Sequence, residues 1–284
     1  MTRETFEAPV PGGVLWGHLQ GPVDAPRAVL LHGGPGLSVS FVDDLAAELA
    51  TAYRVATFQQ RGVEPSTTTG DFTVAEAVTD VAAVLDHLGW DRAYVVGHSW
   101  GGHLAFWVAA SLPGRLLGVL SVDPLGAVGD GGNAAFEAEM AARTPEDARD
   151  RATELDHLAQ QGEVSEELAL EGLRLVWPAY FADPGTAPPM PAESRLSVEA
   201  YSGLFTDLVE RLPELEASLP SITVPVSVLV GDVSPIPMSA GLNSAALIPG
   251  ALTVVVEGAG HFPSYEKPGC VVAALDELSA TRAW

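Results

Sequence analysis

The sequence has few cysteines and few basic residues, and it contains no long apolar run. Its single cysteine, Cys270, excludes an internal disulfide and a zinc site built from cysteines. Lysine and arginine together number 14, against 37 aspartates and glutamates, so the formal net charge is −23. Such a field repels nucleic acid and anionic membrane surfaces. No stretch approaches the ~20 apolar residues that cross a bilayer, so we expect neither nucleic acid nor a membrane as a partner.

The composition is that of a globular protein. Of the 284 residues, 47% are hydrophobic and 18% are charged, which is enough apolar material for a sizeable core. Residues 1–7 carry neither the basic nor the apolar segment of a signal peptide, which predicts a cytoplasmic protein. Cys270 is expected to pack in the last helix.

Short apolar runs alternate with helical patterns along much of the chain. Most runs are continuous, as expected for strands that are covered on both faces. The segment 73–88 between two of them has helical spacing, a capping box of Thr73 and Glu76, and Gly89 at its end. This alternation predicts an α/β fold with a mostly parallel central sheet flanked by helices. The predicted strands are 14–19, 28–32, 54–58, 93–97, 118–122, 226–230 and 252–256.

The alternation stops between residues 129 and 219. Helical patterns occur there at 134–142, 145–161, 165–176 and 198–212, interrupted by a loop rich in proline and glycine at 183–191. No convincing strand lies among them. We therefore predict an all-helical insertion at 129–219 in a core formed by residues 1–128 and 220–284.

A nucleophile motif follows the predicted strand at 93–97. Gly97-His98-Ser99-Trp100-Gly101-Gly102 leads directly into a helical pattern at 104–112. This strand–turn–helix context is what Gly-x-Ser-x-Gly needs to form a nucleophile elbow. The glycines allow a sharp turn that exposes Ser99, and the helix N-terminus favours developing negative charge. Ser99 is the predicted catalytic nucleophile.

A glycine-rich turn, His32-Gly33-Gly34-Pro35-Gly36, follows the predicted strand at 28–32. Backbone N–H groups in such a turn can approach an oxyanion closely. We assign the oxyanion hole to the N–H groups of Gly34 and of Trp100, the residue after the nucleophile. The spacing fits neither a dinucleotide fingerprint nor a P-loop, which argues against a phosphate site. His32 is expected to brace the turn.

The predicted general base is His261. It lies in Glu257-Gly258-Ala259-Gly260-His261-Phe262-Pro263, just after the last predicted strand. A glycine-flanked turn downstream of Ser99 suits the chain order serine, acid, histidine. His261 would take the Ser99 proton and return it to the leaving group.

These three motifs, in this order across nearly the whole chain, resemble the α/β-hydrolase fold. The motifs at 32–36 and 97–102, with Gln-Gln-Arg-Gly at 59–62, are most similar to those of the proline iminopeptidase-like branch. The resemblance implies that the insertion at 129–219 is a helical cap over the catalytic pocket. It also implies acyl transfer to Ser99 and hydrolysis by water, with no metal or cofactor, and an arginine-glycine loop at 61–62 that helps to shape the site.

The triad acid departs from the family's usual pattern. The family places an aspartate three residues after the glycine that ends the seventh strand, but here Ser234 stands three residues after Gly231. A serine cannot carry the negative charge that stabilises an imidazolium. Asp232 lies two residues early, and Asp123 directly follows the predicted strand at 118–122, where some other α/β-hydrolases carry their acid. We favour Asp123 over Asp232, and a dyad without an acid is the third alternative.

A second departure concerns substrate recognition. Proline iminopeptidases resemble one another in cap glutamates that bind the substrate's free amino group, one of them just before an aromatic pair. The comparable segment here, 175–181, places Trp177 where that glutamate would stand. The amine would lose its counter-ion and the pocket would become more apolar. Trp177, Tyr180 and Phe181 are then predicted substrate-binding walls, and packing of the cap on the core is the alternative.

These features favour a serine hydrolase that cleaves an ester, amide or related acyl bond of a small-molecule or short-peptide substrate. Aminopeptidase activity on N-terminal proline is its most specific version, which Trp177 weakens, and an esterase is the stronger competitor. Ser99 argues against epoxide hydrolase and haloalkane dehalogenase chemistry, which needs a carboxylate nucleophile. The alternative from another class is a catalytically slow ligand-binding or signalling protein on the same fold, which only the displaced acid supports.

Overall fold

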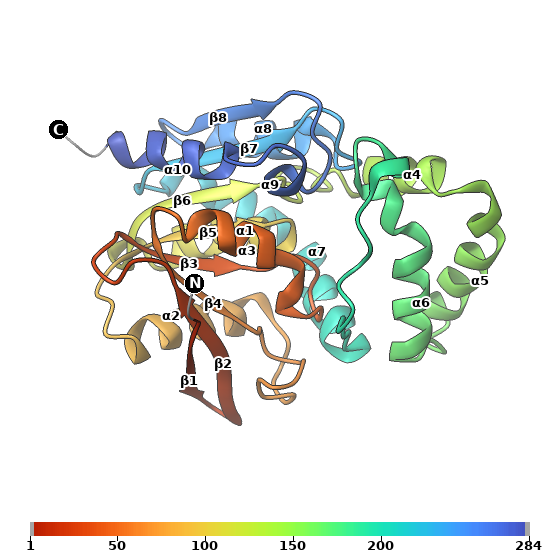
Figure 1. Cartoon of the computed structure of the whole chain (residues 1–284), viewed down its shortest axis with the longest axis horizontal. Helices are drawn as coiled ribbons and strands as arrows, with labels where there is room; N and C mark the ends of the chain where they lie inside the picture. Colours follow the sequence, from red (N-terminus) through yellow and green to blue (C-terminus); the bar gives the residue numbers. More distant parts are fainter. Residues whose placement is uncertain (1–2, 282–284) are drawn as a thin grey trace.

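Within residues 3–281, which the computed structural model describes, eight strands form one sheet at the centre of the molecule (Figure 1). The first two strands make antiparallel pairs, and every later pair is parallel. The mostly parallel α/β sheet that the sequence predicts is confirmed. In sheet order the strands are β1 (Glu4–Val10), β2 (Gly13–Gln20), β4 (Arg54–Phe58), β3 (Arg27–Leu31), β5 (Ala93–His98), β6 (Leu116–Val122), β7 (Val226–Gly231) and β8 (Leu252–Val256).

Helices cover both faces of this sheet and form a separate group beside it (Figure 1). They are α1 (Asp43–Leu49), α2 (Val74–His87), α3 (Trp100–Ser111), α4 (Asn133–Arg143), α5 (Arg149–Gln160), α6 (Glu166–Val176), α7 (Val198–Ser218), α8 (Met238–Leu247), α9 (Pro263–Glu266) and α10 (Cys270–Ala280). Short 3₁₀ turns are η1 (Val39–Val42), η2 (Pro113–Arg115), η3 (Glu146–Ala148), η4 (Trp177–Tyr180), η5 (Pro184–Thr186) and η6 (Leu219–Ser221). Among the described residues, no helix has both the length and the apolar character that a membrane span requires.

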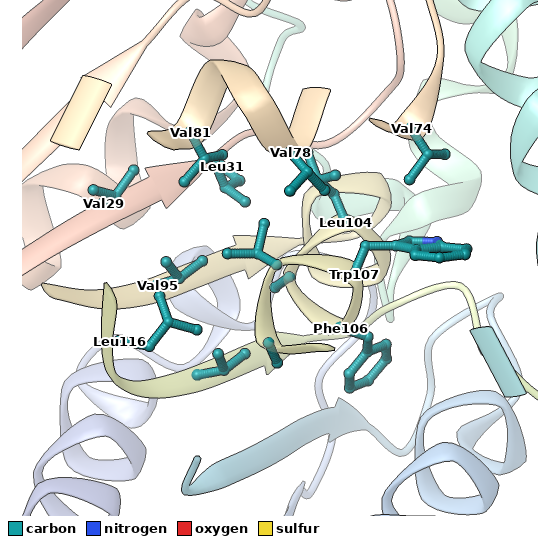
Figure 2. Close-up of a cluster of buried hydrophobic side chains, with 14 of the residues drawn as sticks. Val29, Leu31, Val74, Val78, Val81, Val95, Leu104, Phe106, Trp107 and Leu116 are labelled. Atoms are coloured by element: carbon teal, nitrogen blue, oxygen red, sulfur yellow. The ribbon is translucent and has the colours of Figure 1, made fainter. Parts of the chain in front are cut away.

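Two apolar clusters, one on each face, hold the helices to the sheet. The first joins β3, β5 and β6 to α2 and α3, and Figure 2 shows its valines and leucines meeting between these elements. The second lies under α1 and α10. Each fully buried valine or leucine contributes about 1.5–3 kcal/mol relative to exposure, so these clusters hold the strand ends that carry the candidate site.

The predicted helix at 73–88 forms as α2, with only the Thr73 half of the predicted capping box, because the Glu76 carboxylate accepts the N–H groups of Asp71 and Phe72. The Thr73 side chain accepts a hydrogen bond from the Glu76 N–H at 3.2 Å. Val74, Val78 and Val81 lie on the buried face of this helix. Local capping and apolar spacing therefore agree with the packing.

Among the strands of the described residues, β1 is the one that the sequence analysis did not predict. Only Phe6 and Ala8 of its seven residues are buried, because β1 lies at the edge of the sheet. Two glutamates and Pro9 weaken its apolar signal. Proline is tolerated in an edge strand, where one side of the backbone needs no partner.

The segment 129–219 is helical throughout its regular structure in the described chain. Helices α4, α5 and α6 lie together to one side of the sheet, drawn in green in Figure 1. Helix α7 is different, because Leu204, Leu208 and Leu212 belong to the same buried cluster as α2 and α3. The predicted cap range, 129–219, thus includes α7, a helix that packs on the core.

Candidate active site

Ser99 sits in a strained turn between β5 and α3. Its φ of +57° is rare for a residue with a side chain. The turn is so tight that only glycine fits at two positions. A Cβ on Gly97 would lie 2.0 Å from the Gly101 carbonyl oxygen, and a Cβ on Gly101 would lie 2.2 Å from the Leu31 carbonyl oxygen. The Ser99 N–H donates to the Val122 carbonyl at 2.9 Å, so the turn is fixed to the end of β6. Its side chain remains partly exposed.

Asp123 and His261 meet beside this turn. Asp123 directly follows β6, and its N–H donates to the Leu229 carbonyl of β7 at 2.7 Å. His261 Nδ1 lies 2.6 Å from Asp123 Oδ2. Both residues are almost fully buried, at 3% and 1% exposure. Since the carboxylate accepts the proton on Nδ1, Nε2 is the nitrogen left to take a proton from Ser99.

The Asp123 carboxylate receives two further hydrogen bonds. The Gly231 N–H donates to Oδ1 at 3.0 Å, and the Ser234 hydroxyl donates to Oδ2 at 2.5 Å. Donors around a buried carboxylate offset the cost of removing its charge from water. Ser234 occupies the position at which the family usually carries its acid, and here it supports the aspartate of the neighbouring strand.

The structure does not bring Asp232 to His261. Asp232 is exposed, and its Oδ1 accepts the Gly258 N–H at 2.6 Å. This contact caps the turn after β8. Of the two carboxylates that the sequence analysis weighed, Asp123 is therefore the one in contact with the imidazole.

The glycine-rich turn after β3 lies against Ser99. A Cβ on Gly33 would fall 2.9 Å from Ser99 Cβ, so a side chain there would collide with the nucleophile. Among the hydrogen bonds of residues 3–281, none is donated by the backbone N–H of Gly34 or of Trp100. Both predicted oxyanion donors are thus free to bind a ligand oxygen.

Gln60 connects this turn to the nucleophile elbow. Its Nε2 donates to the His32 carbonyl at 3.0 Å, and its Oε1 accepts the Trp100 indole N–H at 2.9 Å. The backbone N–H of Gln60 donates to His32 Nε2 at 3.2 Å. Gln60 lies in the motif at 59–62, but no signal in the sequence distinguishes it as the residue that makes these contacts.

Buried histidines around the site are held neutral. Burial lowers the pKa of His32 to about 4 and that of His98 to about 3, the latter with a further contribution from nearby His261. His32 donates from Nδ1 to the Gly33 carbonyl at 3.0 Å and accepts at Nε2, which defines one neutral tautomer. The predicted bracing role of His32 agrees with these contacts.

Arg61 lies in the loop that the family resemblance connects with the site, but its side chain turns away. Its guanidinium makes two hydrogen bonds to Asp80, at 2.9 and 2.6 Å, and an ion pair with Glu76 at 3.2 Å. Arg61 and Asp80 are both buried. Arg61 therefore holds the loop to α2 through Asp80 and Glu76, while Gln60 contacts the turns that contain His32 and Trp100.

The three aromatic residues predicted as pocket walls separate into two kinds. Trp177 and Phe181 are buried, at 7% and 2% exposure, and the Trp177 indole donates to the Pro188 carbonyl at 2.7 Å. Both rings pack against Phe262, with centroids 5.0 and 5.2 Å away. They join the inserted segment to the core, which was the alternative interpretation of these residues. The Tyr180 ring lies 5.3 Å from the His261 ring, so Tyr180 alone of the three contacts the candidate triad.

No group of three or more histidine, cysteine, aspartate or glutamate side chains in the described part of the chain is arranged to hold a metal ion. Cys270 is partly buried at the start of α10, and burial raises the pKa of its thiol. The chemistry that this site offers is a hydroxyl, an imidazole, a carboxylate and two unpaired backbone N–H groups.

Comparison with known families identifies the class. The family model of the alpha/beta hydrolase fold matches residues 26–268. The chain therefore belongs to the α/β-hydrolase family, as its sheet and nucleophile turn indicate.

Individual relatives match only part of the chain. Epoxide hydrolase B of Mycobacterium tuberculosis is 37% identical over 100 residues, which are 34% of this chain and 28% of that protein. A candidate carbamate hydrolase, RutD, of a Caulobacter species is 36% identical over 98 residues, 34% of this chain and 37% of that protein. These matches thus span about a third of the relatives' own lengths.

Solved structures match the whole fold. The enol-lactonase from Burkholderia xenovorans superposes with a TM-score of 0.68 at 21% sequence identity, over 97% of this chain and 100% of that one. At this identity the likeness establishes the architecture. The reaction has to be argued from the site itself.

Proposed function

We propose that the protein is a serine hydrolase that cleaves an ester, amide or related acyl bond of a small substrate. The observation that carries the proposal is the 2.6 Å contact between His261 Nδ1 and Asp123 Oδ2, next to a serine in a strained turn. Ser99 is the proposed nucleophile, His261 the general base and Asp123 the acid. This arrangement has the roles of a catalytic triad.

The proposed reaction follows from these roles. His261 Nε2 takes the Ser99 hydroxyl proton while Oγ attacks the substrate carbonyl carbon. The N–H groups of Gly34 and Trp100 bind the resulting oxyanion, and Nε2 then gives its proton to the leaving group. Water, activated by the same nitrogen, hydrolyses the acyl-enzyme and restores Ser99.

The chemistry of Ser99 favours acyl bonds over epoxides. Opening an epoxide through a covalent ester requires a carboxylate nucleophile, and the elbow here carries a hydroxyl. The partial match to Epoxide hydrolase B suggests epoxide opening, but Ser99 at the reacting position argues against that reaction. Carbamates and simple esters are substrates whose carbonyl carbon a serine nucleophile can attack.

Esterase activity is favoured over proline aminopeptidase activity. The motif resemblance to the proline iminopeptidase-like branch supports the peptidase, which needs a carboxylate for the substrate's free amine. Trp177, which stands where that glutamate would lie, is buried against the core, and its indole N–H donates a hydrogen bond to the Pro188 carbonyl. An amine brought to the Trp177 ring would meet an apolar side chain in place of a carboxylate and would lose part of its hydration.

The test compares p-nitrophenyl butyrate with proline p-nitroanilide, using wild type and Ser99→Ala. We expect release from the ester that disappears in Ser99→Ala, and little release from the anilide. Labelling of Ser99 by a fluorophosphonate checks nucleophile activation independently of substrate choice. Absence of both labelling and turnover would favour the ligand-binding alternative.

A further inference from the structure

The main chain of His261 is held from two sides. Its N–H donates to the Tyr180 carbonyl at 2.8 Å. Tyr180 is the last residue of the η4 turn in the inserted segment. Its own carbonyl accepts the His98 Nε2 proton at 2.7 Å. One hydrogen bond comes from the inserted segment and the other from the last residue of β5, so the position of His261 depends on both parts.

A single carboxylate strengthens the connection to the inserted segment. Glu266, the last residue of α9, accepts the Ala182 N–H at Oε1 at 2.8 Å and the Gly260 N–H at Oε2 at 2.7 Å. Gly260 directly precedes His261, and Ala182 lies two residues after Tyr180. Glu266 therefore bridges the histidine turn and the chain that follows Tyr180.

The two segments approach each other too closely for a side chain at the crossing. A Cβ on Gly260 would lie 2.6 Å from the Ala182 nitrogen and 2.7 Å from the Tyr180 carbonyl oxygen. Both Gly260 and Ala182 present N–H donors to this space. Two donors facing each other need a common acceptor, and the Glu266 carboxylate supplies it.

The imidazole lies between rings from the same two parts of the chain. The His98 ring is 4.6 Å from the His261 ring, and the Tyr180 ring is 5.3 Å from it on the side of the inserted segment. A shift of residues 180–182 would move both a backbone partner and a ring partner of His261. A misplacement of about 1 Å in a reacting group can cost ~10²-fold in rate.

We propose that Glu266 is a positioning residue that joins segment 180–182 to the histidine turn, so that the seating of this segment sets the orientation of His261 toward Ser99. The inference rests on the proposed function in assigning His261 as the base. It adds a residue that touches neither the substrate nor the reacting atoms and acts through the backbone of the base.

The principal variant is Glu266→Gln, with Glu257→Gln as the matched control. The amide keeps one carbonyl acceptor but loses the second, so one of the two backbone donors loses its partner. Glu257 precedes the same turn, is exposed and forms no hydrogen bond within residues 3–281, while its substitution removes the same charge. Gly260→Ala is the second perturbation, because its methyl group would meet the Ala182 nitrogen, the Tyr180 carbonyl oxygen and Glu266 Oε2, and so separates the segments while the carboxylate keeps its charge.

Two readouts separate positioning from a general structural effect. For Glu266→Gln we expect kcat for p-nitrophenyl butyrate to fall about 10- to 100-fold, with KM changed by less than about threefold. The downfield proton resonance of the His261–Asp123 hydrogen bond should broaden or shift. Glu257→Gln should leave both unchanged, and Gly260→Ala should reproduce the effect of Glu266→Gln. All variants are measured well below their unfolding temperatures.

The proton resonance makes the test independent of the proposed reaction. If wild type hydrolyses neither substrate and Ser99 is not labelled by the fluorophosphonate, or if Ser99→Ala retains activity, the proposed function fails and the resonance alone decides the role of Glu266. A resonance in Glu266→Gln and Gly260→Ala identical to that of wild type overturns the proposal. So does a kcat within about twofold of the control for both variants.

Discussion

Replacing Asp123 with asparagine is expected to trap His261 in the wrong tautomer. Oδ1 accepts the Gly231 N–H at 3.0 Å, so the oxygen of the new amide takes that place, because an NH₂ group there would face a donor. The NH₂ group then occupies the Oδ2 position, 2.6 Å from His261 Nδ1. The Ser234 hydroxyl, which donates to Oδ2 in the wild type, can rotate to accept from this NH₂ group, whereas the Gly231 N–H can only donate. It donates to Nδ1, and the imidazole must carry its proton on Nε2, where it can no longer accept from Ser99.

The size of this effect follows from the chemistry that is lost. An amide in place of a triad carboxylate lowers kcat by about 10⁴-fold in serine proteases, which corresponds to ~5.5 kcal/mol. We expect a similar loss for Asp123→Asn, because 1% exposure leaves no room for water to replace the carboxylate. The substitution conserves shape, so the folded structure should persist.

The assay measures kcat and KM on p-nitrophenyl butyrate and the rate of fluorophosphonate labelling at Ser99. Asp232→Asn is the matched control, because it removes the same charge from an exposed position and its amide oxygen can still accept the Gly258 N–H. Its kcat should stay within about twofold of wild type. If Asp232→Asn loses activity by orders of magnitude while Asp123→Asn does not, the acid assignment is refuted.

Three further predictions concern the support of the site and the stability of the fold. Ser234→Ala removes one donor from Asp123 but leaves the contact to the imidazole, so kcat should fall about 10-fold, and an unchanged kcat would show that this bond has no orienting role. Stability should fall with pH below 6.5, because buried histidines whose folded pKa is lowered to about 3 or 4 take up protons on unfolding. Each such histidine should give the free energy of unfolding, measured by urea titration, a slope of about 1.4 kcal/mol per pH unit down to its folded pKa. His103→Gln should remove one of these contributions. A free energy of unfolding that does not change with pH would contradict the reasoning. Asp80→Asn leaves the buried Arg61 charge without its main partner and should lower the free energy of unfolding by about 3–5 kcal/mol, and a loss below about 1 kcal/mol would mean that the charge finds another partner.

The sequence predicts the parts of this molecule that local chemistry determines. The glycines around Ser99 and the apolar strand before it indicate the sharp turn, because only glycine allows approaches of about 2 Å between a Cβ position and a carbonyl oxygen. The alternating runs indicate the parallel sheet. Strand β1 lacks such a signal because an edge strand buries few residues.

Features that depend on distant contacts could be ranked from the sequence, as Asp123 was above Asp232, but the sequence alone does not determine them. Asp123 and Asp232 both fit the required chain order, and only the approach of the histidine turn distinguishes them. The aromatic residues Trp177 and Phe181 carry the same apolar signal whether they line a pocket or pack the inserted segment on the core. The bridge made by Glu266 joins two backbone segments, at Ala182 and Gly260, and no local pattern encodes such a contact.

The position of Asp123 after β6 has a consequence for the strand beside it. The histidine turn comes from β8, so it must pass over the end of β7 to reach β6. It does so across Gly231, where a Cβ would lie 2.4 Å from the carbonyl oxygens of both Ala259 and Gly260. The end of β7 thus supports the histidine turn by backbone contact, without supplying the carboxylate that contacts His261. A search pattern that demands an aspartate three residues after the glycine that ends the seventh strand would pass over this chain, whereas a pattern built on that glycine and a serine three residues later would match it.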